Sequence, residues 1–211
     1  MRANPRIVPR RRASVGARRL ALGAIAGPLV YDVAWIVLGF TRDGYSPTAQ
    51  FVSDLGTGPN AAVLNAASVL YGLLLIAGVA GVFLGLRDEL EKRALWTSAV
   101  LLSLPGVGGI LEGLFPDEES PAHGLAFLLA FVVTPVFGFV VAGRRLASVP
   151  RYRRFGRALA RVGAPVTVAL VVLLLVSISA AGDLDGLMAR VVVLALHGWY
   201  ATLGRCAFRS A

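Results

Sequence analysis

The sequence predicts an all-α integral membrane protein, a bundle of six transmembrane helices with both termini in the cytoplasm. Of the 211 residues, 56% are hydrophobic and only 16% are charged, whereas soluble domains have about 45–50% apolar and about 25% charged residues. Six apolar runs reach the length of about 20 residues that crosses a bilayer. All of the 21 basic residues except Arg42 and Arg190 lie at one set of helix ends or in the terminal segments.

The first three helices are expected at residues 20–40, 61–86 and 94–111. The first follows an Arg-rich segment, but it is too long for the apolar core of a signal peptide and lacks a small-residue cleavage site, so we expect it to be retained. Pro59 and Asn60 precede the second and are typical of a turn followed by a helix start.

The last three helices are expected at residues 122–142, 158–181 and 188–206. Pro135 and Pro165 lie inside two of these runs. Membrane helices tolerate such prolines because neighbouring helices satisfy the backbone groups that proline leaves free. We therefore treat each run as one helix.

Charge sets the predicted orientation, with the basic helix ends in the cytoplasm of a multi-pass cell-membrane protein. Residues 1–19 are basic and contain proline, so we expect a disordered cytoplasmic tail on anionic headgroups, ahead of a single domain over 20–206 and a short C-terminus over 207–211. The basic residues lack interleaved aromatics, so membrane lipids and not nucleic acid are the expected partner, with the oligomeric state open.

The opposite helix ends are acidic and hold most polar residues of chemical interest. Eight of the 12 acidic residues lie there: Asp43, Asp54, Glu112, Asp117, Glu118, Glu119, Asp183 and Asp185. Two longer connections, 41–60 and 112–123, combine these carboxylates with proline and with a polar residue at the next helix start. We expect any binding site to lie on this side.

Two polar residues lie deeper. Counted at 1.5 Å per residue, Asp32 and His197 both lie about 12–14 Å below the outer surface, so they are able to meet. A charged aspartate facing lipid is costly, so Asp32 is expected to face the bundle interior. We predict an outward-facing polar pocket that includes Asp32, Asn60, Asn65 and Tyr71; a purely structural hydrogen-bonding role for Asp32 and His197 stays open.

Six residues are candidates for a catalytic site: Ser53, Asp54, Glu112, Asp117, His123 and His197. His123, His197 and Asp117 would suit Zn²⁺ with an open position for water. Ser53 with His123 and a carboxylate would suit a nucleophilic triad, and the same groups would suit a proton or cation relay. No motif has a diagnostic spacing, so helix capping by Ser53-Asp54 and a solvated acidic turn at Asp117 remain open as well.

The two long acidic connections carry the clearest family likeness. They resemble an uncharacterised family of six-helix bacterial and archaeal membrane proteins, domain of unknown function 998, through Tyr45-Ser46, Val52-Ser53-Asp54-Leu55-Gly56, Gly58-Pro59-Asn60-Ala61 with Asn65, and Gly113-Leu114-Phe115-Pro116-Asp117 with His123. The resemblance covers about residues 20–206 and implies six membrane helices but no reaction. The Ser-Asp-Leu-Gly and Pro-Asn elements are also distantly similar to the FRAG and DRAM membrane proteins, some of which are linked to lipid remodelling.

A second resemblance is to the membrane hydrolases that include alkaline ceramidases and adiponectin receptors, which use serine, aspartate and several histidines to hold zinc. This chain departs from them in having six predicted helices and only two histidines. The sequence thus predicts a membrane protein of unknown biochemical function, with lipid handling as the leading hypothesis. A metal-dependent or serine-type lipid hydrolase and a small proton-coupled transporter are the alternatives, and zinc is the one cofactor considered.

Overall fold

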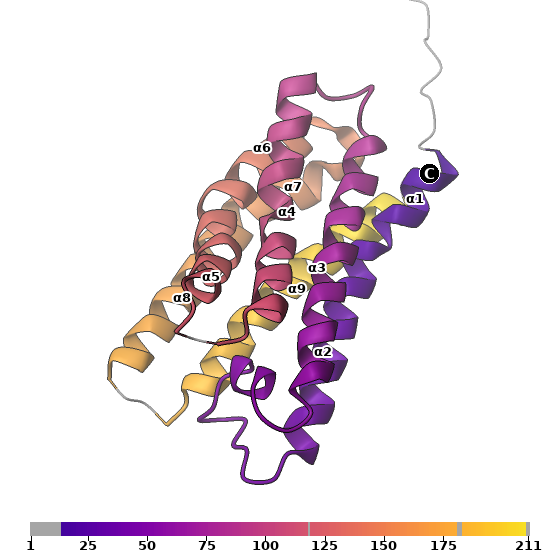
Figure 1. Cartoon of the computed structure of the whole chain (residues 1–211). Coiled ribbons are helices and arrows are strands. Elements are labelled where there is room, and N and C mark those ends of the chain that lie inside the picture. The colour runs from indigo at the N-terminus through magenta and orange to yellow at the C-terminus, as the bar shows by residue number, and fades with distance from the viewer. Residues whose placement is uncertain (1–13, 118, 181–182, 210–211) are drawn as a thin grey trace, which may run out of the picture.

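The computed structural model describes residues 14–117, 119–180 and 183–209. These residues form helices and contain no strand (Figure 1). Six helical stretches are long and apolar enough to cross a membrane: Val15–Thr41, Ala61–Leu84, Lys92–Leu114, Pro121–Ser148, Pro150–Ser179 and Asp185–Arg209. The predicted all-α class with six transmembrane helices is confirmed.

The first span is made of α1 (Val15–Ala21) and α2 (Gly23–Thr41). It begins within the segment predicted to be disordered, and this part of the prediction is wrong for residues 15–19. Ser14 accepts a hydrogen bond from the Ala17 amide at 3.2 Å and caps the helix. Arg18 donates to the Phe208 carbonyl at 3.1 Å, so the end of the chain holds this turn in place. The rest of the predicted tail, residues 1–13, lies outside the described residues.

The second and third spans are α3 (Ala61–Leu84) and α4 (Lys92–Leu114). A short 3₁₀ turn, η1 (Ser53–Gly56), lies in the connection before α3. Asn60 has a φ of 61° and directly precedes α3, a left-handed conformation that asparagine tolerates better than most residues. The predicted helix start after Pro59 is therefore observed.

The fourth span changes its winding midway. It consists of α5 (Pro121–Phe127), the π-helix η2 (Leu128–Gly138) and α6 (Phe139–Ser148). Pro135 has no amide proton to donate, and wide turns of this kind accommodate the backbone groups left over. Within the same wide turns the Thr134 hydroxyl donates to the Leu129 carbonyl at 2.9 Å.

The fifth span comprises η3 (Pro150–Tyr152), α7 (Arg153–Ala158), the π-helical η4 (Leu159–Gly163) and α8 (Ala164–Ser179), and the sixth is α9 (Asp185–Arg209). The fifth and sixth spans thus extend further at the basic end than the apolar runs predict. Arginine allows this extension because its long stem packs along apolar surface while the charged head reaches water.

The six spans form a closed ring in chain order. α2 packs on α3 and α9, α3 on α4, α4 on η2, η2 on α8, and α8 on α9 (Figure 1). Glycines bring the helices close together, as at the α3–α4 crossing, where a Cβ at Gly106 would lie 2.7 Å from the Gly72 carbonyl oxygen. Small residues at such crossings supply the close van der Waals packing that holds membrane helices together.

Both ends of the described chain lie at the same end of the bundle, since α1 contacts α9 near its last turn (Figure 1). The connection over residues 42–60 and the turns between α4 and α5 and between α8 and α9 lie at the opposite end. We call this opposite end the loop end. The site described next lies toward this end.

Candidate functional site

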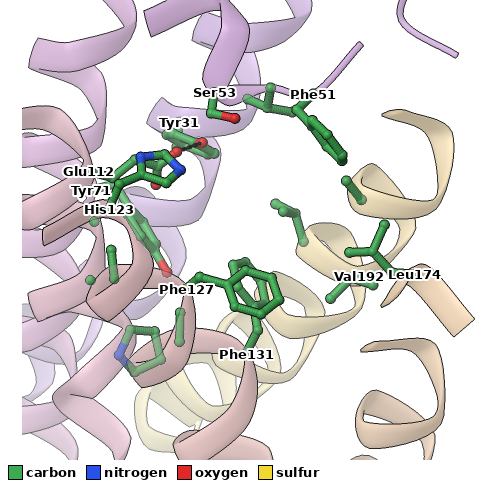
Figure 2. Close-up of a pocket in the computed structure, with 18 of the residues that line it drawn as sticks. Tyr31, Phe51, Ser53, Tyr71, Glu112, His123, Phe127, Phe131, Leu174 and Val192 are labelled. Carbon is green, nitrogen blue, oxygen red and sulfur yellow. Dashed lines mark hydrogen bonds between the residues drawn. The ribbon is translucent and has the colours of Figure 1, made fainter. Parts of the chain in front are cut away.

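A cavity of about 370 Å³ lies inside the ring toward the loop end (Figure 2). All six spans contribute to its wall, and so does the connection before α3. Its lining residues include Tyr31 on α2, Tyr71 on α3, Glu112 on α4, His123 on α5, Leu174 on α8 and His197 on α9. Residues far apart in the sequence therefore meet around one cavity.

One wall of the cavity is polar. Figure 2 shows Tyr31, Tyr71, Glu112 and His123 grouped together, with Ser53 nearby. The Tyr31 hydroxyl donates to Glu112 Oε1 at 2.9 Å, which joins α2 to α4 across 81 positions of sequence. The Nδ1 atom of His123 is buried, and no partner for it lies within the described residues. A buried imidazole nitrogen without a partner is costly, and a hydrogen-bond partner supplied by a bound molecule would remove that cost.

The other wall is apolar. Phe127 and Phe131 pack together with their ring centroids 5.4 Å apart, and Leu174 and Val192 face them across the cavity (Figure 2). Phe51, from the connection before α3, closes the same side. The cavity is therefore amphipathic, with polar and apolar surfaces on separate walls.

The predicted meeting of Asp32 and His197 is observed. Asp32 Oδ1 lies 2.9 Å from His197 Nδ1 and also accepts a hydrogen bond from Trp35 Nε1 at 3.0 Å. Both side chains are largely buried, with 15% of Asp32 and 6% of His197 exposed. His197 lines the cavity and packs between the rings of Tyr31 and Tyr71, at centroid distances of 5.9 and 5.1 Å. Asp32 thus orients an imidazole that forms part of the cavity wall.

Arg190 anchors the connection over residues 42–60 to α9. Its guanidinium is buried and donates to the carbonyls of Gln50 and Gly186, each at 2.8 Å, and to the Tyr45 hydroxyl. It also lies over the rings of Trp35 and Tyr45, at 5.3 and 5.6 Å from their centroids. Burial raises the pKa of the Tyr45 hydroxyl, an effect that the Arg190 charge partly offsets, so this hydroxyl stays protonated at neutral pH.

Sequence reasoning missed this role. It treated Arg190 only as an exception to the charge asymmetry. The signal that points to it is a lone arginine near the start of a helix on the acidic side, where a buried guanidinium needs several acceptors.

We expect Arg190→Ala to release the connection from the bundle. The variant leaves the Gln50 carbonyl and the Tyr45 hydroxyl without their buried donor, at a cost of about 2–4 kcal/mol in the free energy of unfolding. Limited proteolysis should then cut within residues 42–60 much faster than in the wild type. Arg205→Ala, an exposed arginine near the other end of α9, is the control and should leave the cleavage rate unchanged; equal cleavage in both variants would contradict the anchoring role.

The remaining predicted site residues lie outside the cavity wall and organise the loop end. Asp54 Oδ2 accepts from the Phe51 amide at 2.8 Å, and Asn65 Nδ2 donates to the Gly56 carbonyl at 3.0 Å. Asn60 and Asp117 are exposed, and Asp117 Oδ1 accepts from the Glu119 amide at 3.1 Å. The predicted acidic neighbour Glu118 falls outside the described residues.

The positions of the described side chains were compared with the metal site and the nucleophilic site that the sequence suggests. Within the described ranges, no group of three or more His, Cys, Asp and Glu side chains is placed to hold a metal ion. Zinc binding by His123, His197 and Asp117 stays a prediction. Ser53 and His123 share the cavity wall with Glu112, so the groups named for a nucleophilic site do face one space.

Comparison with known proteins gives a family but no activity. No curated protein and no solved structure matches the chain. A family described as "Protein of unknown function (DUF998)" matches residues 25–205, from the start of α2 to the last turns of α9. The matched segment includes part or all of each of the six spans and every described residue of the cavity wall. The chain is therefore an integral membrane protein that belongs to the DUF998 family, whose function is unknown.

Proposed function

We propose that the protein handles membrane lipids by binding an amphipathic, lipid-like molecule in the cavity. The observation that carries this proposal is the separation of polar and apolar walls around one space inside a ring of membrane helices. A head group would contact Tyr31, Glu112 and His123, while a hydrocarbon chain would lie along Phe127, Phe131 and Leu174. Apolar burial of the chain supplies the affinity, and the polar wall fixes its direction.

The size and position of the cavity support this function. Its volume of about 370 Å³ falls within the roughly 300–1,000 Å³ of small-molecule sites. α5 packs on α4 and η2, and the cavity fills the space between α5 and the facing helices α8 and α9. Leu125 on α5 and Leu175 on α8 are exposed apolar side chains that do not line the cavity. A lipid in the bilayer would therefore approach the cavity through apolar surface.

We also place the basic end of the bundle in the cytoplasm. Arginines and lysines concentrate at the end that carries α1 and the last turn of α9, and cytoplasmic segments of membrane proteins are enriched in them. The cavity then lies in the outer half of the membrane and opens from the acidic loop end, as the sequence predicts.

Lipid binding is a first step that the two alternative functions share. A hydrolase that used Ser53 or His197 on a lipid ester would first have to hold the lipid at the polar wall. A transporter that used the Asp32–His197 pair would likewise need an occupied cavity. Occupancy is therefore the measurement to make first.

Filling the cavity is expected to block occupancy. Ala189 lies on the cavity wall in α9, so Ala189→Phe should lower the bound amphiphile about tenfold. The measurement is photo-crosslinking of purified protein in phosphatidylcholine nanodiscs, with dodecyl probes that carry a diazirine on the chain and an amine, alcohol or carboxylate head. Mass spectrometry of the wild type should map the adducts to Phe127, Phe131 or Val192.

Ala201→Phe makes the same exchange on the same helix outside the cavity wall and is the matched control. It should keep the wild-type yield and the wild-type pattern of adducts. If none of the three probes labels the cavity peptides of the wild type, or if both variants label equally, the cavity is not a binding site and the proposal fails.

A further inference from the structure

The polar wall of the cavity offers carboxyl oxygens as hydrogen-bond acceptors. Among the described lining residues Glu112 is the one with a carboxyl group, and the Asp32 carboxyl group lies directly behind His197. Among the described lining residues there is no lysine or arginine. The nearby guanidiniums of Arg42 and Arg190 donate instead to the backbone of the connection before α3, at Asp54 and Gln50.

The acceptor groups on this wall are able to accept further hydrogen bonds. A carboxylate accepts about four hydrogen bonds, and Glu112 Oε1 receives one from Tyr31. His123 Nδ1, which is an acceptor in the tautomer with the proton on Nε2, is buried without a partner within the described residues. The rings of Tyr31 and Tyr71, with centroids 5.5 Å apart, add electron-rich faces beside the same carboxylate.

We propose that the head group bound here is a protonated amine, so that the ligand is a long-chain amine or a related amphiphile with a primary ammonium. This inference rests on the proposed lipid-binding function and names the class of lipid. The ammonium would donate to Glu112 and to the unpartnered nitrogen of His123, and its charge would lie against the two tyrosine rings. A primary ammonium has three donors, which matches several acceptors grouped on one wall.

The other common head groups fit this wall less well. A carboxylate or phosphate head would lie beside the Glu112 carboxyl group, and the described lining residues include no lysine or arginine to neutralise the charge of that head. An alcohol would satisfy one or two hydrogen bonds and would leave further acceptor positions of Glu112 unfilled. An ammonium fills several of these positions and also supplies a hydrogen-bonded counter-charge for the ionised carboxyl group.

The test compares the three dodecyl photo-probes in phosphatidylcholine nanodiscs at neutral pH, with each yield normalised to partitioning into empty nanodiscs. For the wild type we expect the amine to label the cavity peptides at least about tenfold better than the alcohol or the carboxylate. Glu112→Gln should remove most of this preference, so that the amine labels the cavity peptides about as well as the alcohol does. Glu119→Gln neutralises an exposed carboxylate of the next connection and should keep the wild-type preference.

A competition experiment uses the wild type alone, so its result does not depend on whether a variant folds. Unlabelled dodecylamine should displace the amine probe at a concentration at least about tenfold lower than dodecanol does. Equal labelling by all three heads, equal competition, or an unchanged preference in folded Glu112→Gln would overturn the ammonium inference and leave lipid binding intact. Absence of labelling by every probe would instead remove the proposed function itself.

Discussion

Gly72→Val is expected to prevent the bundle from assembling. A Cβ at this position would overlap the Gly106 carbonyl oxygen and would lie 2.7 Å from Ile110 Cγ1. The first of these atoms belongs to the backbone, so it cannot move aside as a flexible side chain would. α3 and α4 would have to separate along the most extensive helix contact in the protein. Overpacking of this kind costs about 1–3 kcal/mol or more in the free energy of unfolding, and the variant should lose its monodisperse elution in size-exclusion chromatography.

Gly198→Val provides the matched control within the same membrane bundle. Nothing lies within 4 Å of a Cβ built at Gly198, in the middle of α9. This variant should elute as the wild type does and keep its thermal midpoint within a few degrees. If the two variants behave alike, close contact between α3 and α4 is not what holds the bundle together.

The number and class of the helices could be predicted because the bilayer imposes them. A membrane span must satisfy its backbone groups internally over a fixed length, so apolar runs of that length identify it. The helix ends were less predictable, as the first span shows. Arg18 and Arg19 interrupt the apolar pattern, yet α1 continues through them because Arg18 reaches the backbone of Phe208.

Some features of the candidate site could likewise be predicted from the sequence, and others could not. Depth follows from helical rise, so the meeting of Asp32 with His197 was within reach of the sequence. The pairing of Tyr31 with Glu112 was not, because it depends on how α2 and α4 are rotated about their axes, and glycine contacts between helices decide that rotation. The role of Arg190 depends on the path of the connection over residues 42–60, which has no periodic pattern to indicate it.

Asp32→Ala should be the most destabilising single polar change inside the bundle. The carboxylate accepts from Trp35 Nε1 and pairs with His197 Nδ1, and both partners are inside the membrane-spanning helices. Removing it leaves two buried nitrogens without their acceptor, for which we expect a loss of about 3–5 kcal/mol, the range measured when one partner of a buried pair is removed. Asp32→Asn keeps one acceptor oxygen and should lose less, about 1–2 kcal/mol.

A double-mutant cycle separates the pair from a general loss of packing. Asp32→Ala, His197→Ala and the double variant would be unfolded reversibly by denaturing detergent in mixed micelles. If the 2.9 Å contact holds α2 against α9, the double variant should lose at least about 1 kcal/mol less stability than the sum of the two single losses, because the second change removes a group whose partner is already gone. Strict additivity would mean that each residue acts through its own packing. His197 would then owe its position on the cavity wall to the rings of Tyr31 and Tyr71 and not to Asp32.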